Sequence, residues 1–209
     1  MRGTLRGMLW ILGIGGAIWL LLSLFVFDNW TVPHGSDRLF ETSLAPTLGA
    51  DDHVLVRKGT QPRFGELARC MHPTESRYVV GRVFGEPGDR VEVSDKGVAT
   101  NGKHVASAHG CGTVTVVHPA TEALVTMHCG EVEMGAGSFR YLHAPADQSI
   151  GTHNATVEAG KLFLVSDNRS MHEDSRDFGQ VDQSTCEHIV FRLWGEHYMD
   201  SSRRFTIIW

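Results

Sequence analysis

The sequence predicts a mainly β protein with one long apolar segment near its start. Short β-rich runs, separated by glycine and proline, recur roughly every 8 to 12 residues, and no helical periodicity of useful length follows the first segment. Charged residues make up 21% and hydrophobic residues 42% of the 209 residues, which is a globular composition. The chain is therefore long enough for one β domain of ordinary size behind an N-terminal anchor.

The apolar segment runs without a charge from Met8 to Phe27, close to the ~20 residues that a helix needs to cross a bilayer. A cleavable export signal is the alternative, but the run is longer than a usual signal core and no Ala-x-Ala site follows before Asp28. Because Arg2 and Arg6 precede the segment, the positive-inside tendency leaves the rest of the chain outside the cytoplasm. We therefore predict a single-pass protein of the plasma (inner) membrane, with a cytoplasmic stretch over 1–7, a transmembrane anchor over 8–27 and an extracytoplasmic domain over 28–209.

The formal net charge is −5, and the part after residue 27 is two units more negative because it lacks the two N-terminal arginines. An acidic domain has no electrostatic footprint for phosphate backbones. Nucleic acid is therefore excluded as a partner.

The β-rich runs after the anchor are expected to form strands over 54–56, 67–71, 77–84, 90–93, 161–165 and 189–194. Asn101-Gly102 predicts a hairpin turn. From about residue 104 the composition changes to small and polar residues, with short strands expected over 113–117 and 123–128. We therefore expect a core over 28–97 and 158–200 and an inserted small β subdomain over 98–157.

Four sequence boxes occur in a fixed order along this domain: 43–48, 52–56, 82–91, and 166–169 continuing through 174–176 to Gly179. Together they resemble the bacterial type I signal peptidases, membrane-anchored serine endopeptidases that remove signal peptides from exported proteins. The resemblance implies a coiled β-sheet catalytic domain, signal peptides of exported preproteins and the lipid bilayer as partners, and no cofactor. No metal is expected either, because the histidines and cysteines fit no zinc-ligand spacing.

Ser43 is the nucleophile that the resemblance implies. Pro46 biases Ala45 toward extended geometry, so we expect the chain to pass Ser43 stretched. The backbone N–H of Ser43 is the natural oxyanion donor, but the family's second donor position holds Glu41, which as a carboxylate cannot donate, beside Thr42. Loss of one oxyanion donor raises the activation barrier by about 3 kcal/mol. The alternative is an ordinary loop serine bonded to the backbone.

The family's general base, a lysine, is absent. Its position lies four residues before the glycine that opens the Gly-x-Pro-Gly-Asp turn, and counting back from Gly85 gives Gly81. Arg82 follows, but it stays protonated and faces the other side of a strand. The usual serine–lysine pair therefore cannot form.

His172 is the candidate substitute. It stands where the family has a serine, six residues after Ser166, and histidine is the commonest general base. We expect it to lean into the space beside the missing lysine, with Asp174 or Glu173 orienting its second nitrogen. Asp174 is alternatively expected to hold the loop through an ion pair with Arg176. If His172 is instead an exposed loop residue, the chain is a weak or inactive homologue that binds exported segments or a membrane partner.

The four cysteines are Cys70, Cys111, Cys129 and Cys186. Outside the cytoplasm disulfides persist. Three pairings are possible, and the positions suggest one bridge within the insert and one within the core that flanks it. Free buried cysteines are the alternative.

Overall fold

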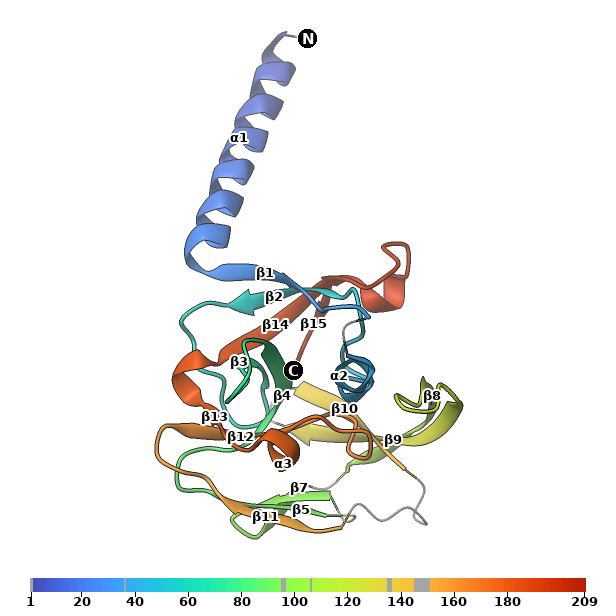
Figure 1. The fold of residues 1–209 in the computed structure, drawn as a ribbon. Helices are drawn as coiled ribbons and strands as arrows, with labels where there is room; N and C mark the ends of the chain where they lie inside the picture. Colours follow the sequence, from blue (N-terminus) through green and yellow to red (C-terminus); the bar gives the residue numbers. More distant parts are fainter. Residues whose placement is uncertain (1, 36, 95–96, 106, 135–136, 145–150) are drawn as a thin grey trace.

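The computed structural model describes residues 2–35, 37–94, 97–105, 107–134, 137–144 and 151–209, with side chains from Trp10 onward. Helix α1 (Arg2–Phe25) projects from a β body that contains the rest of the chain (Figure 1). Among the residues so described, no helix has both the length and the apolar character that crossing a bilayer requires. The transmembrane helix predicted over 8–27 is therefore not supported by the structure.

The strands of the described residues form three sheets, which confirms the mainly β prediction. The largest sheet is curled and has the order β1–β2–β14–β3–β4–β12–β13, with β15 also paired to β14 (Figure 1). Its members are β1 (Phe27–Thr31), β2 (His53–Arg57), β3 (Leu67–Met71), β4 (Tyr78–Gly85), β12 (Lys161–Val165), β13 (Val181–Asp182), β14 (Glu187–Trp194) and β15 (Thr206–Ile207). The predicted strands of the core all appear, and each pairs with a neighbouring strand on both sides.

Two smaller sheets come from the middle of the chain. One has the order β10–β9–β8, formed by β8 (His109–Val117), β9 (Leu124–Met134) and β10 (Gly137–His143). The other has the order β11–β5–β6–β7, formed by β5 (Arg90–Ser94), β6 (Gly97–Thr100), β7 (Lys103–Val105) and β11 (His153–Thr156). The predicted hairpin turn joins β6 to β7, and both Asn101 and Gly102 have positive φ there. The predicted domain boundaries remain a prediction, and β5 pairs with strands of the inserted region.

The two faces of β4 pack into different parts of the core. Val80 belongs to a cluster with Phe40 and Leu44, whereas Val79 and Val83 pack with the strands around Cys70. Alternation along a strand produces this division. Position 81 therefore shares a face with Val79 and Val83, and position 82 lies on the face of Val80.

Both disulfides join the partners that the sequence suggested. Cys70 on β3 bonds to Cys186, the residue just before β14, with their Cα atoms 4.1 Å apart. Cys111 on β8 bonds to Cys129 on β9, with a Cα separation of 5.0 Å. The pairing of β8 with β9 shifts between Gly110 and Gly112, so Cys111 is the extra residue of a β-bulge.

Candidate active site

Helix α2 (Arg38–Ser43) contains the predicted nucleophile. Oδ1 of Asp37 accepts hydrogen bonds from the backbone N–H groups of Leu39 (2.9 Å) and Phe40 (3.2 Å), which is an N-cap. The expectation of an extended chain through Ser43 is therefore wrong. The cap starts a helix that ends at Ser43, and Pro46 restricts only itself and the preceding Ala45, both of which lie after the helix.

The hydroxyl of Ser43 is fully buried and donates to the backbone carbonyl of Phe40, with an Oγ–O distance of 2.7 Å. Ser43 lies on the same helix face as Phe40 and Leu44, which are also buried. A serine hydroxyl that donates to a carbonyl of its own helix makes a structural hydrogen bond. Attack on a carbonyl would require the hydroxyl to leave this bond.

The side chains at and beside the family's second oxyanion-donor position have other partners. The hydroxyl of Thr42 donates to the carbonyl of Val117 on β8 at 3.3 Å, and the Glu41 carboxylate accepts from the backbone N–H of Gly35. The backbone N–H of Ser43 remains the predicted donor.

The loop after β12 docks on this segment. The backbone N–H of Asn168 donates to the carbonyl of Ser43 (3.1 Å), and its side-chain amide donates to the carbonyl of Thr42 (3.1 Å). Asn168 is itself fully buried. The first and last sequence boxes are therefore in direct contact.

A buried ion pair joins the third box to the same loop. Arg82 donates from Nε (2.9 Å) and Nη2 (2.8 Å) to the two oxygens of Asp167. Thr47, just after the Ser43 helix, donates to Oδ2 of Asp167 at 2.5 Å. Arg82 and Asp167 are almost completely inaccessible to solvent. One carboxylate therefore fixes β4, the Ser43 segment and the loop after β12 relative to one another.

Gly81 does not leave the open space that we expected for an imidazole. A Cβ atom at this position would lie 3.0 Å from Cβ of Leu164 and 3.5 Å from the backbone of Val165. The reason is the close antiparallel pairing of β4 with β12. Glycine here lets the two strands approach.

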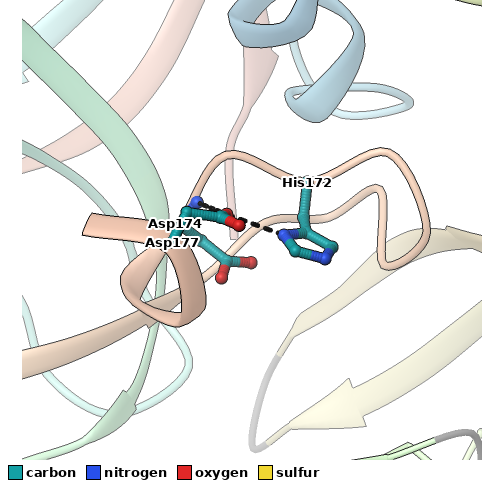
Figure 2. Close-up of side chains that lie close together, drawn as sticks. All are labelled: His172, Asp174 and Asp177. Atoms are coloured by element: carbon teal, nitrogen blue, oxygen red, sulfur yellow. Dashed lines mark hydrogen bonds and ion pairs between the residues drawn. The ribbon is translucent and has the colours of Figure 1, made fainter. Parts of the chain in front are cut away.

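His172 is paired with an acid other than the one predicted. Its Nδ1 lies 2.7 Å from Oδ2 of Asp177, and its side chain is 23% exposed (Figure 2). Asp177 belongs to α3 (Ser175–Phe178), where the same oxygen accepts from the backbone N–H of Asp174. The sequence signal that we missed is the capping box, an N-cap Asp174 followed by an acidic residue three positions later. The role of His172 as a base remains a prediction.

Asp174 is instead committed to holding the loop, as the alternative reading anticipated. Its oxygens accept from Nε (2.9 Å) and Nη2 (2.7 Å) of Arg176 and from the backbone N–H of Ser166 (2.8 Å). Burial on its own would raise the pKa of Asp174, but the bonds and charge of Arg176 together with the Ser166 N–H lower that pKa below its ordinary value. Asp174 is therefore ionised at neutral pH, and both of its carboxylate oxygens already accept hydrogen bonds.

His172, Asp174 and Asp177 could each offer one ligand atom to a cation, because these atoms lie within 4.8 Å of one another (Figure 2). Both oxygens of Asp174 are already used by Arg176, however. A metal ion would have to displace that guanidinium, so the donor set does not fit a resident metal.

A second arginine of the loop, Arg169, is buried without such a carboxylate partner among the residues that the structure describes. The guanidinium of Arg169 lies 4.8 Å from the ring centre of Phe84 and 5.5 Å from that of Tyr141. Burial lowers the pKa of Arg169 to about 10, and the negative charge of Asp167 opposes the shift. Arg169 therefore stays protonated at neutral pH, and stacking on aromatic rings takes the place of an ion pair.

The curled β-sheet thus brings the Ser43 segment against the Asp167-Asn168-Arg169 loop, which joins the sequence boxes that carry the family resemblance. The family model described as signal peptidase, peptidase S26, matches residues 5–194. The chain belongs to this family.

Curated relatives match most of the chain at modest identity. Signal peptidase I of Bacillus caldolyticus is 27% identical over 195 residues, which cover 90% of this chain and 91% of the relative. Signal peptidase I V of Bacillus subtilis (strain 168) is 26% identical over 154 residues, covering 71% of this chain and 78% of the relative. Signal peptidase IB of Staphylococcus aureus (strain COL) is 24% identical over 192 residues, covering 88% of each.

Proposed function

We propose that this chain is a membrane-bound serine endopeptidase that removes signal peptides from exported preproteins through an acyl-enzyme at Ser43. The observation that carries the proposal is the docking of Asn168 on the Ser43 segment, which assembles the family's motifs around one serine. The names of the relatives support signal-peptide processing as the activity.

In the proposed reaction, the hydroxyl of Ser43 leaves the carbonyl of Phe40 and gives its proton to Nε2 of His172. The Ser43 oxygen attacks the scissile carbonyl, and the leaving amine takes the proton from His172 as the peptide bond breaks. Water then attacks the acyl-enzyme ester. His172 takes a proton from the water and returns it to the Ser43 oxygen as the ester bond breaks. Asp177, rather than Asp174, orients the imidazole through Nδ1, as an acid does in a serine-histidine-acid triad.

A second candidate is a non-catalytic homologue that binds exported segments or a membrane partner without cutting them. Two observations favour it: the Ser43 hydroxyl is buried in a bond to Phe40, and Leu164 fills the space at Gly81. Loss of the base from a catalytic triad costs on the order of 10⁶ in rate. Such a homologue would cleave almost nothing.

The two candidates are separated by cleavage of a preprotein with an Ala-x-Ala site by the wild-type chain and by Ser43→Ala, His172→Ala and Asp177→Asn. Glu196→Gln is the control, because this acid is exposed and its ion-pair partner is His197 rather than a residue of the candidate site. Activity that disappears in Ser43→Ala and His172→Ala and drops in Asp177→Asn supports the peptidase with this base. Equal trace signals in all five proteins support the non-catalytic homologue. Activity that is lost in Ser43→Ala but retained in His172→Ala would assign the base to another residue.

We also propose that α1 attaches the chain to the membrane. From Trp10 to Phe25 its large apolar side chains are exposed, and lipid would cover them. After cell fractionation, the full chain should remain in the membrane pellet in high salt, and a chain beginning at Phe27 should not. Release of the full chain by salt would refute the attachment.

A further inference from the structure

One edge of β14 is covered by the short segment Phe205–Trp209. On the other edge β2 pairs along β14 from His188 to Trp194. On the edge covered by the segment, β3 pairs only with Glu187 and His188 of β14. Further along the same edge, β15 pairs with Phe191 and Arg192. The backbone N–H groups of Phe205 and Ile208 add bonds of 3.0 Å to the carbonyls of Leu193 and Val190. An extended peptide would make the same main-chain bonds to this edge.

Two residues of the segment fit shaped positions. The indole of Trp209 packs against Gly137 of β10, where a Cβ atom would collide with the ring. Ile208 is only 5% exposed and packs in the same cluster as Phe40 and Leu44, which flank Ser43. Ile207 is 60% exposed and faces away from these positions.

The groove is wider than the segment that occupies it. A cavity of about 380 Å³ lies on one side, lined by Phe64, Met134 and Phe139 as well as by the segment. A second cavity of about 390 Å³ lies on the other side and reaches Pro46 and Thr47. The segment therefore divides a larger groove that extends to the residues just after Ser43.

The same segment completes the hydrogen bonding of the buried arginine. Nη1 of Arg82 donates to the backbone carbonyl of Trp209 and, at 2.7 Å, to that of Gly65. The other donors of Arg82 hold Asp167, which accepts from Thr47. A buried guanidinium that loses a carbonyl needs another acceptor, and a peptide in the groove would supply one.

We propose that the groove between β14 and β10 is a binding site for an extended apolar peptide and that Phe205–Trp209 occupies it as an internal ligand. The bound peptide pairs with the edge of β14, buries an aliphatic side chain in place of Ile208, lays a large apolar side chain on Gly137 and gives a carbonyl to Arg82. The natural occupant is an apolar segment of an exported preprotein, and this part rests on the proposed function. The internal segment must leave before the peptide enters, so the free site is masked in the resting chain.

The test is fluorescence anisotropy with a labelled synthetic peptide that has the sequence of residues 204–209. It is added to the full wild-type chain, to Ile208→Ser, which weakens the internal ligand, and to Ile207→Ser, the matched control at an exposed position. Because Ile208 anchors the segment and Ile207 does not, we expect Ile208→Ser to bind the peptide about tenfold more tightly than the other two proteins. Adding Gly137→Val to Ile208→Ser should abolish binding.

Equal affinity in all three proteins, or binding that survives Gly137→Val, would overturn the site. A chain that ends at Arg204 is a further variant with an empty groove; if it does not fold, the comparison of the two isoleucine variants decides. Formation of a dimer by Ile208→Ser without peptide would show exchange between copies and overturn the preprotein as occupant.

A second peptide, with an apolar signal-peptide core and an Ala-x-Ala site, should displace the labelled one, whereas a charged peptide of equal length should not. Failure of this displacement would refute the preprotein as occupant. All binding is also measured in Ser43→Ala, so the result does not depend on whether the chain cleaves anything.

Discussion

The ion pair of Arg82 and Asp167 gives the sharpest test of how the site is held together. Asp167→Asn keeps the size of the side chain and removes its charge. The change leaves Arg82, which is fully buried, without a counter-ion, and it turns one acceptor of two bonds into an amide that donates. Removing one partner of a buried pair costs about 3–5 kcal/mol. This is a large part of the roughly 5–15 kcal/mol that a domain has in total.

The measurement is denaturant unfolding followed by tryptophan fluorescence with both disulfides intact. Arg140→Gln is the control, because its pair with Glu131 is exposed and worth roughly 0–1 kcal/mol. The double variant Arg82→Met/Asp167→Leu should recover most of the loss, since it removes both charges together. If Asp167→Asn unfolds within 1 kcal/mol of the wild type, the pair does not hold the three segments as the geometry indicates.

Three further predictions follow from contacts in the core. Gly81→Lys should destabilise the chain by about 1–3 kcal/mol in the same unfolding assay without raising cleavage, because its Cβ would press on Leu164; an active, stable variant would contradict this. Replacing Cys70 and Cys186 by alanine should cost about 5 kcal/mol against about 3 for the other bridge, because the closed loops span 116 and 18 residues; equal losses would argue against loop entropy as the cause. Burial lowers the pKa of His188 below 6.5, so the folded chain resists protonation there, and stability should fall as the pH drops below 6.5; His188→Gln should flatten that decline, and an unchanged pH profile would refute the assignment.

The local signals in the sequence predicted most of the fold. Runs such as 67–71 and 161–165 form strands because branched and aliphatic side chains suit a sheet that is buried on both faces. Asn101-Gly102 makes the predicted turn because both residues accept positive φ. These properties depend on a few neighbouring residues, so the sequence shows them directly.

The site was harder to predict because its geometry depends on contacts between distant residues. Asp167 and Arg82 are 85 residues apart, and nothing local indicates that a single carboxylate joins them. The helix at Ser43 was missed because the N-cap at Asp37 was not recognised and Pro46 was taken to extend the chain before it. The partner of His172 was missed because Asp174, nearer in sequence, is already held by Arg176.

The bulge at Cys111 has a use in studying how the chain folds. Because Cys111 is the extra residue, every residue of β8 after it is offset by one position relative to β9, and the bond to Cys129 lies where this offset begins. Formation of this disulfide therefore reports that the two strands have paired in the native register. Trapping thiols at successive times during refolding, followed by mass spectrometry, would date the moment at which this hairpin locks relative to the rest of the protein.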